Sequence, residues 1–244
     1  MTPIRVTLCG EPDLLRACAP GSGSGSVEYE TSRGDEPDDS RADVVIALGS
    51  PPGGVLDAPV ITWVERGSPL TPAGDRDRVI GPWPGAWRRL VLPVADALFG
   101  AAPDGPAGRA AWLGDQGARR AEYEALFTHS VELVETSPAE APSAPVALNI
   151  HENGAPAFEH RAAVALAAGC VLVSETLAPA HGLEPGLDYL EGRTLDDLYL
   201  GVENAAAAPA AFRRMRLRGR AKAERFRAST LLERVARDLL LELA

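Results

Sequence analysis

The stretch FEHRAAVALAAGCVLVSE at residues 158–175 decides the fold class. Its alanine-rich part predicts a helix over 157–168, and Gly169 suits the left-handed conformation that ends many helices. The apolar run 170–174 predicts a strand that is buried on both faces, as in a parallel sheet covered by helices. Helix, stop and strand in such close succession indicate an α/β protein. The core needs none of the charged side chains at the two ends of the stretch.

The rest of the chain repeats this alternation on both sides of a break. Short apolar runs fill the first part, and the segment 92–108 then carries three prolines and three glycines. We therefore expect two Rossmann-like domains that face each other across a cleft. One sheet continuous through both halves would instead indicate an unrelated α/β regulator. The expected parts are a compact N-terminal domain at 1–92, an interdomain linker at 93–108, and a C-terminal domain at 109–244 that includes the C-terminal helices.

Composition limits the class of partner. The 244-residue chain has 24 Lys and Arg residues against 34 Asp and Glu residues, so nucleic acid would repel a protein of net charge −10. No apolar stretch approaches the roughly 20 residues that span a bilayer. The start MTPIRVTLCG lacks the layout of a signal peptide. We therefore predict a cytoplasmic protein that binds no nucleic acid.

Motifs of several common enzyme classes are absent from the sequence. The first strand–helix turn, CGEPD, has one glycine and thus no dinucleotide fingerprint. A phosphate loop ending in Gly-Lys-Ser/Thr, a G-x-S-x-G elbow and an H-E-x-x-H pair occur nowhere. Cys9, Cys18 and Cys170 lie at no metal-like spacing, which predicts buried thiols. Hydride transfer, P-loop phosphoryl transfer, α/β-hydrolase chemistry and zinc proteolysis are therefore disfavoured.

Two arginines open the helix expected at 118–128. The sequence LGDQGARR places Arg119 and Arg120 in the first turn, where the helix dipole disfavours cations. An anion such as a diphosphate, bound between the exposed N–H groups and the guanidinium groups, would explain the placement. The alternative is that nearby carboxylates neutralise both arginines at a wet surface.

Further polar residues follow two expected strands, 146–150 and 170–174. Ligands of open α/β sheets bind beyond the carboxyl ends of the strands, so these residues are candidates for a binding site. The alternatives are a structural histidine, an arginine lying over its helix, and a simple tight turn. The candidates are Asn149, His151, Asn153, Glu159, Arg161, Glu175, His181 and Gly182.

The order of these segments resembles one family. Strand, N-x-H, F-E-x-R, A-L-A-A-G-C, apolar strand, S-E, H-G-L and P-G-x-D-Y are similar to the sugar-nucleotide half of GT-B glycosyltransferases. The resemblance is closest to the bacterial group-1 branch often labelled spore-maturation or CgeB-like. LPVADALF is similar to the interdomain linker, and LGDQGARR to the opening of the second domain. The match covers about residues 90–240, and the first 90 by architecture.

The resemblance implies a metal-independent glycosyltransferase of the hexosyltransferase type. A nucleotide-sugar donor would serve as co-substrate, with no cofactor, and the acceptor is unknown. His151 becomes the catalytic candidate, in contact with the transferred sugar or the acceptor. The implied nucleotide- and sugar-binding residues are Gly114, Arg119, Arg120, Asn149, Asn153, Glu159, Arg161, Glu175, His181 and Gly182.

The sequence departs from the family at two positions. The glutamate that usually grips the ribose hydroxyls falls on Val164, and its partner eight residues earlier falls on Pro156. A valine accepts no hydrogen bond, so ribose recognition must come from elsewhere, such as Glu159 or Glu175, or is lost. The competing hypothesis is therefore a catalytically degenerate GT-B-like binding or scaffolding protein.

A basic segment follows near the C-terminus. RRMRLRGRAKAERFR at 213–227 carries eight basic residues and one acidic residue. On a helix, an apolar stripe lies between the arginines, which predicts a helix packed across the second domain with a solvated basic face. The alternative is peripheral contact with an anionic membrane surface, where many glycosyltransferases find lipid-linked acceptors.

Overall fold

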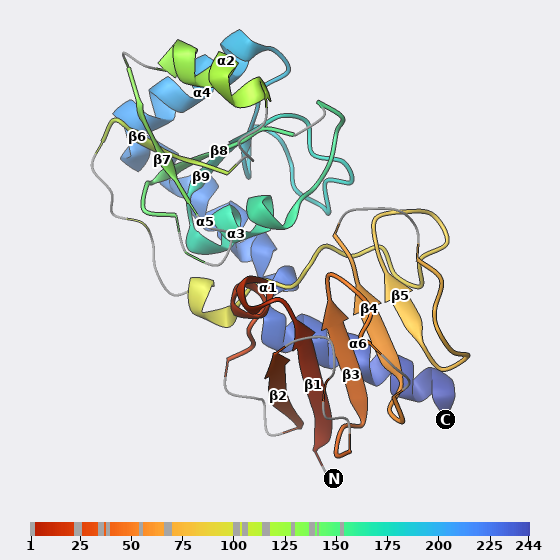
Figure 1. The fold of residues 1–244 in the computed structure, drawn as a ribbon. Helices are drawn as coiled ribbons and strands as arrows, with labels where there is room; N and C mark the ends of the chain where they lie inside the picture. Colours follow the sequence, from red (N-terminus) through yellow and green to blue (C-terminus); the bar gives the residue numbers. More distant parts are fainter. Residues whose placement is uncertain are drawn as a thin grey trace. The chain divides into compact units, whose positions relative to one another are not determined.

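Two compact units make up the chain in the computed structural model. Unit 1 comprises residues 1–97 and 225–244, and unit 2 comprises residues 98–224. Each unit contains one five-stranded sheet in which every strand pair is parallel (Figure 1). The described residues are 3–21, 26–33, 37, 40–53, 56–65, 70–99, 103, 107–113, 118–127, 130–136, 140, 142–151 and 154–244.

The sheet of unit 1 has the strand order β2-β1-β3-β4-β5. Its third strand, VVIAL, is buried at every position, as an uninterrupted apolar run predicts for a parallel strand. A short helix, α1 (Pro12–Ala17), follows the first strand. The strands are β1 (Ile4–Gly10), β2 (Val27–Arg33), β3 (Val44–Leu48), β4 (Val60–Trp63) and β5 (Arg78–Ile80).

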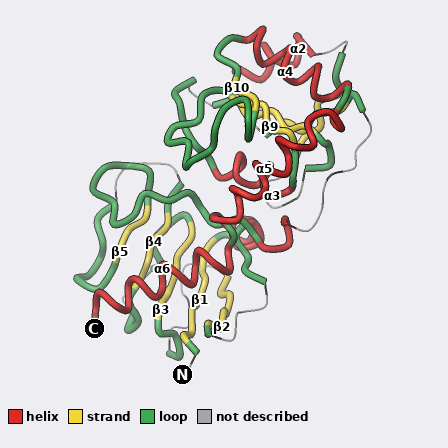
Figure 2. The backbone as a smooth tube through the Cα atoms, turned by 180° about the vertical axis from the view of Figure 1, so that it is seen from behind, coloured by secondary structure: helices red, strands yellow, loops and turns green. Residues whose placement is uncertain are grey.

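The last helix of the chain, α6 (Ala228–Leu243), belongs to unit 1 and lies along its sheet (Figure 2). The sequence pattern places both C-terminal helices in the second domain, so the structure differs here. The apolar face of α6 is buried within unit 1, where α1 is the one other α-helix among the described residues. Tyr29 Oη donates to Ser229 O (3.2 Å), and Trp87 Nε1 donates to Glu242 Oε1 (2.8 Å).

The sheet of unit 2 has the order β10-β9-β8-β6-β7. Helices α2 and α4 pack on one face, while α3, with α5 against it, covers the other (Figure 1). Short 3₁₀ turns cover Asp96–Phe99, Pro209–Phe212 and Glu224–Phe226. The elements are β6 (Arg109–Trp112), α2 (Ala118–Phe127), β7 (Glu132–Glu135), β8 (Val146–Asn149), α3 (His160–Ala168), β9 (Val171–Ser174), β10 (Leu190–Glu191), α4 (Leu195–Ala207) and α5 (Arg213–Ala223).

The helix–stop–strand stretch folds as its sequence predicts, with a later start. Helix α3 begins at His160, after an extended residue, Glu159, at its N-cap. Gly169 ends it in the left-handed region (φ 79°), and β9 follows at Val171. All nine residues of α3 are buried. Helix α5 lies so close that a Cβ at Gly219 would stand 2.8 Å from the Leu166 side chain.

Leucine substitutions on α6 should separate its buried face from its exposed face. Leu232 is 0% exposed and Leu241 is 77% exposed. Leu232→Ala should lower the free energy of unfolding by about 2–5 kcal/mol, because it leaves a cavity. Leu241→Ala should change it by less than about 0.5 kcal/mol. Urea unfolding of both variants makes the comparison, and equal effects would mean that α6 does not stabilise unit 1.

Candidate functional site

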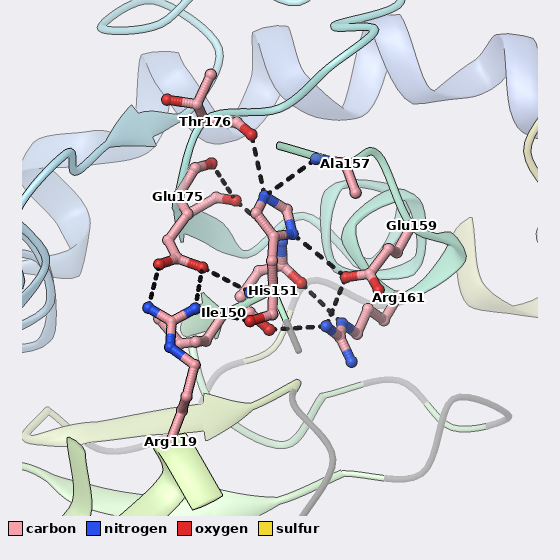
Figure 3. A network of polar contacts seen from close by, with 10 residues as sticks. Arg119, Ile150, His151, Ala157, Glu159, Arg161, Glu175 and Thr176 are labelled. Carbon is pink, nitrogen blue, oxygen red and sulfur yellow. Dashed lines mark hydrogen bonds and ion pairs between the residues drawn. The ribbon is translucent and has the colours of Figure 1, made fainter. Parts of the chain in front are cut away.

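Polar side chains from three segments meet at the carboxyl edge of the unit 2 sheet (Figure 3). Arg119 comes from the start of α2, which follows β6. His151 follows β8, and Glu175 follows β9. Strands β6, β8 and β9 are parallel neighbours, so the segments that leave their carboxyl ends emerge side by side. Hydrogen bonds between these segments bring Arg119, His151 and Glu175 together, and their role as binding residues stays a prediction.

A bidentate ion pair joins Arg119 to Glu175. Nη2 of Arg119 donates to Oε1 of Glu175 (2.6 Å), and Nη1 donates to Oε2 (3.1 Å). Nη1 also donates to His151 O (2.7 Å), and Nη2 to Tyr123 Oη (3.1 Å). Glu175 Oε2 in turn accepts the backbone N–H of His151 (2.7 Å). The backbone N–H and C=O of His151 therefore both bond to the Arg119–Glu175 ion pair.

The ring of His151 is buried. Its Nε2 lies 3.0 Å from Thr176 O and its Nδ1 lies 3.4 Å from Glu159 Oε2. The backbone N–H of Ala157 also donates to Nε2 (3.5 Å). Protein groups therefore contact both ring nitrogens of His151, as the alternative of a structural histidine expects. Its direct contact with a sugar or acceptor stays a prediction.

Arg161 lies in the interior rather than over the surface of its helix. Its Nε donates to Asn149 Oδ1 (2.9 Å), and its Nη2 donates to Ile150 O (2.7 Å) and to Glu159. Asn149 Nδ2 donates to Ser174 Oγ (2.9 Å), which ties β8 to β9. The interpretation of Arg161 as a surface arginine lying over its helix is wrong, because the side chain is buried and its guanidinium group bonds to the chain at both ends of the β8–α3 connection.

Arg120 lies apart from this cluster. Its guanidinium group pairs with Glu124, one helical turn away, and with Glu135 at the end of β7 (2.7 Å). Hydrogen bonds with these two carboxylates raise the pKa of Arg120. Neutralisation by nearby carboxylates, the alternative left open by the sequence, is what the structure shows for this arginine. A diphosphate would reach Arg120 only if Glu124 and Glu135 released it.

Two predicted site residues, Gly114 and Asn153, lie outside the described residues. Two others, His181 and Gly182, lie in the loop after β9. The ring of His181 packs edge-on against Phe158, with 4.9 Å between ring centroids. His181 has a positive φ of 47°, which is uncommon for a residue with a side chain.

A cluster that the sequence analysis missed fixes this loop to α5. The buried carboxylate of Asp188 forms ion pairs with Arg218 Nε (2.9 Å) and with Nζ of Lys222 (2.6 Å), the single lysine of the chain. Lys222 Nζ also donates to Gly182 O (2.7 Å). Burial by itself raises the pKa of Asp188, but the hydrogen bonds from Lys222, the Glu184 N–H and Arg218 outweigh it and lower this pKa. The lone lysine in an arginine-rich chain was the available signal.

The basic segment is largely a packed helix in unit 2. Met215 and Phe212 pack against the core of the unit, and Arg216 Nε donates to Gly169 O (2.6 Å). In the described parts of the chain, no helix is long and apolar enough to cross a membrane. Among the same residues, no three His, Cys, Asp or Glu side chains converge as a metal site would require.

Three solved structures of similar architecture are glycosyltransferases. An α-glucosyltransferase in complex with UDP and a 13-mer DNA containing an HMU base has a TM-score of 0.61 and 10% identity, over 98% of this chain and 100% of that one. An α-glucosyltransferase with UDP-glucose and DNA containing an abasic site has a TM-score of 0.60 and 8% identity, with the same coverage. An α1,3-fucosyltransferase with GDP-fucose has a TM-score of 0.50 and 9% identity, over 88% of this chain and 81% of that one.

The fold is GT-B-like. The sequence itself matches no protein-family model and no curated protein. At such low identity the structural likeness establishes the fold and leaves the chemistry to the site. It supports the GT-B part of the sequence resemblance, while the spore-maturation branch stays a prediction.

Val164, the residue on which the sequence resemblance places the family's ribose-binding glutamate, lies in the core of unit 2. Its side chain is 1% exposed, on a helix that is buried along its whole length. A carboxylate here would have to be buried rather than reach an open nucleotide site. Val164 is therefore a packing residue in the core of this chain.

Val164→Glu should destabilise the protein strongly. An uncompensated buried carboxylate costs about 3–5 kcal/mol, so this variant should unfold at lower urea than Val164→Gln, which has a similar shape without the charge. The difference should shrink as the pH falls and the carboxyl group becomes protonated. A folded Val164→Glu protein with the wild-type midpoint and tighter nucleotide binding would contradict the buried placement.

The Asp188 cluster should make the free energy of unfolding fall at low pH. A carboxylate whose folded-state pKa is lowered contributes stability above its unfolded pKa of about 4, and this stability is lost as the pH falls through the folded value. Asp188→Asn should therefore lower the urea midpoint at pH 7 and weaken its decline between about pH 5 and 2. The exposed Asp196→Asn is the matched control. Equal pH profiles for the two variants would contradict the role of Asp188.

Proposed function

We propose that the protein transfers a sugar from a nucleotide-sugar donor to an acceptor. The observation that carries the proposal is the meeting of Arg119, His151 and Glu175 at the carboxyl edge of the second sheet in a GT-B-like fold. Open parallel sheets bind ligands at this edge. The similar solved structures hold UDP, UDP-glucose and GDP-fucose, so a nucleoside diphosphate sugar is the class of ligand to test.

The leaving diphosphate would bind Arg119. Its guanidinium group is about one-third exposed (34%), so a ligand can reach it, and Tyr123 and His151 O orient it. A fixed cation beside the leaving group stabilises the negative charge that develops there, and this needs no metal ion. Metal-independent transfer is therefore the mechanism that we propose. His151, at the centre of the cluster, is the residue that we propose for contact with the transferred sugar or the acceptor.

A second function, binding without turnover, is favoured by one observation. Val164 is buried, and the network of Arg161, Glu159 and Asn149 is satisfied by the chain itself. Site residues whose hydrogen bonds are all made within the chain are expected of a GT-B-like scaffold that has lost its ribose contacts. Release of free UDP or GDP from UDP-glucose or GDP-fucose in the presence of candidate acceptors separates the two functions. Donor binding with no release would favour the scaffold.

Three further properties belong to the same proposal. The net charge of −10 disfavours nucleic acid as a partner, although the similar α-glucosyltransferases were solved with DNA. We also propose action in the cytoplasm. The exposed Arg213 and Arg214, at the start of the segment 213–227, would supply the peripheral contact with an anionic membrane surface.

Arg119→Ala should weaken the binding of UDP or GDP by about tenfold to a hundredfold, because charge-assisted hydrogen bonds contribute about 1.5–3 kcal/mol. The matched control is Arg109→Ala, since Arg109 forms a bidentate pair with Glu132 (2.8 and 2.7 Å) at the amino end of the same sheet. The two arginines are equally exposed, at 34% and 33%. Titration calorimetry compares them, and equal affinities would remove Arg119 from the binding site.

A further inference from the structure

The carboxylate of Glu175 accepts hydrogen bonds from donors that could equally bind a phosphate group. Both terminal nitrogens of Arg119 point at its two oxygens, and the His151 N–H points at one of them (Figure 3). A forked guanidinium group and a backbone N–H bind a phosphate in the same way as a carboxylate. The chain thus presents an anion site that one of its own side chains fills.

We propose that Glu175 is an internal competitor of the donor's diphosphate for Arg119. This inference rests on the proposed function, and it adds a step: the ligand must displace Glu175 before it can bind the guanidinium group. The displaced carboxylate would turn towards solvent, because it would otherwise lie beside a second anion. The diphosphate would then receive the same donors, two from Arg119 and one from the His151 N–H.

The position of the pair permits this exchange. Arg119 is 34% and Glu175 is 17% exposed, whereas the neighbouring pair of Arg161 and Glu159 is buried. Ion pairs that reach solvent contribute little to stability, so their partners exchange readily. Buried pairs resist the loss of one partner. The contact between Arg119 and Glu175 is therefore the one in this network that a ligand can replace most easily.

Arg119 keeps its place when Glu175 leaves. Its bonds to His151 O, after β8, and to Tyr123 Oη, on its own helix, do not involve the carboxylate. Gly154 borders the same guanidinium group: a Cβ at this position would stand 3.4 Å from Nη1, and its φ of +65° also favours glycine. The absence of a side chain at Gly154 therefore leaves room beside Nη1.

The test is the affinity of the full-length protein for inorganic pyrophosphate, UDP and GDP, measured by titration calorimetry. Glu175→Gln removes the charge and keeps an oxygen that accepts the His151 N–H. The matched control is Glu132→Gln, which breaks the bidentate pair with Arg109 and changes the net charge equally. We expect Glu175→Gln to bind pyrophosphate roughly tenfold more tightly than wild type, about 1.4 kcal/mol, and Glu132→Gln to match wild type.

A second variant guards against misfolding. Glu175→Asp keeps the charge but is one methylene shorter, so it should loosen the bidentate pair and bind pyrophosphate with an affinity between wild type and Glu175→Gln. Urea midpoints establish that each variant is folded. If Glu175→Gln does not fold, the affinity of Glu175→Asp decides: no gain over wild type overturns the inference.

The outcomes separate this inference from the proposed function. Unchanged or weaker pyrophosphate binding by Glu175→Gln, with nucleotide-sugar turnover by the wild type, overturns the competitor and leaves glycosyl transfer standing. Glu175 would then hold the ligand or the fold. Tighter pyrophosphate binding without any binding of UDP or GDP supports the filled anion site and refutes the proposed function. No binding of any probe by any variant refutes both.

Discussion

The buried guanidinium group of Arg161 is the constraint around which the carboxyl edge of the second sheet is organised. A cation taken out of water must find acceptors, because an unpaired buried charge costs several kcal/mol. Asn149 and Ile150, at the end of β8, provide two, and Glu159, at the start of α3, provides the third. The segment between β8 and α3 is thereby held at both ends.

His151 connects the buried network around Arg161 to the partly exposed pair of Arg119 and Glu175. Its ring contacts Glu159 and Thr176 in the interior, while its backbone contacts Arg119 and Glu175 nearer to solvent. The inner contacts are costly to break and the outer ones are not. A buried network that is hard to break, beside an exposed ion pair that can exchange, suits a binding site, because the groups that would meet a ligand are oriented in advance.

Sequence pattern predicts the elements of this edge well and their side-chain environments poorly. The helix–glycine–strand pattern of α3 and β9 depends on neighbouring residues, and so does the placement of Asn149 and Glu175 at strand ends. The burial of Arg161 depends on acceptors up to twelve positions away, and the Arg119–Glu175 pair joins positions 56 apart. An amphipathic pattern likewise shows that α6 buries one face but does not show which sheet receives it.

The same internal contacts that stabilise the edge oppose ligand binding. A ligand gains only the difference between its own contacts and those that it replaces, so each internal partner of Arg119 or Arg161 reduces the free energy available for affinity. Valine at position 164 acts in the same direction, because it stabilises α3 and offers no hydrogen bond to a ribose. Arg161 and Val164 are sealed, which confines any exchange to the exposed rim. Under the proposed function, donor recognition would therefore depend on how readily Arg119 is released from Glu175, rather than on the ribose contact used by the family that the sequence resembles.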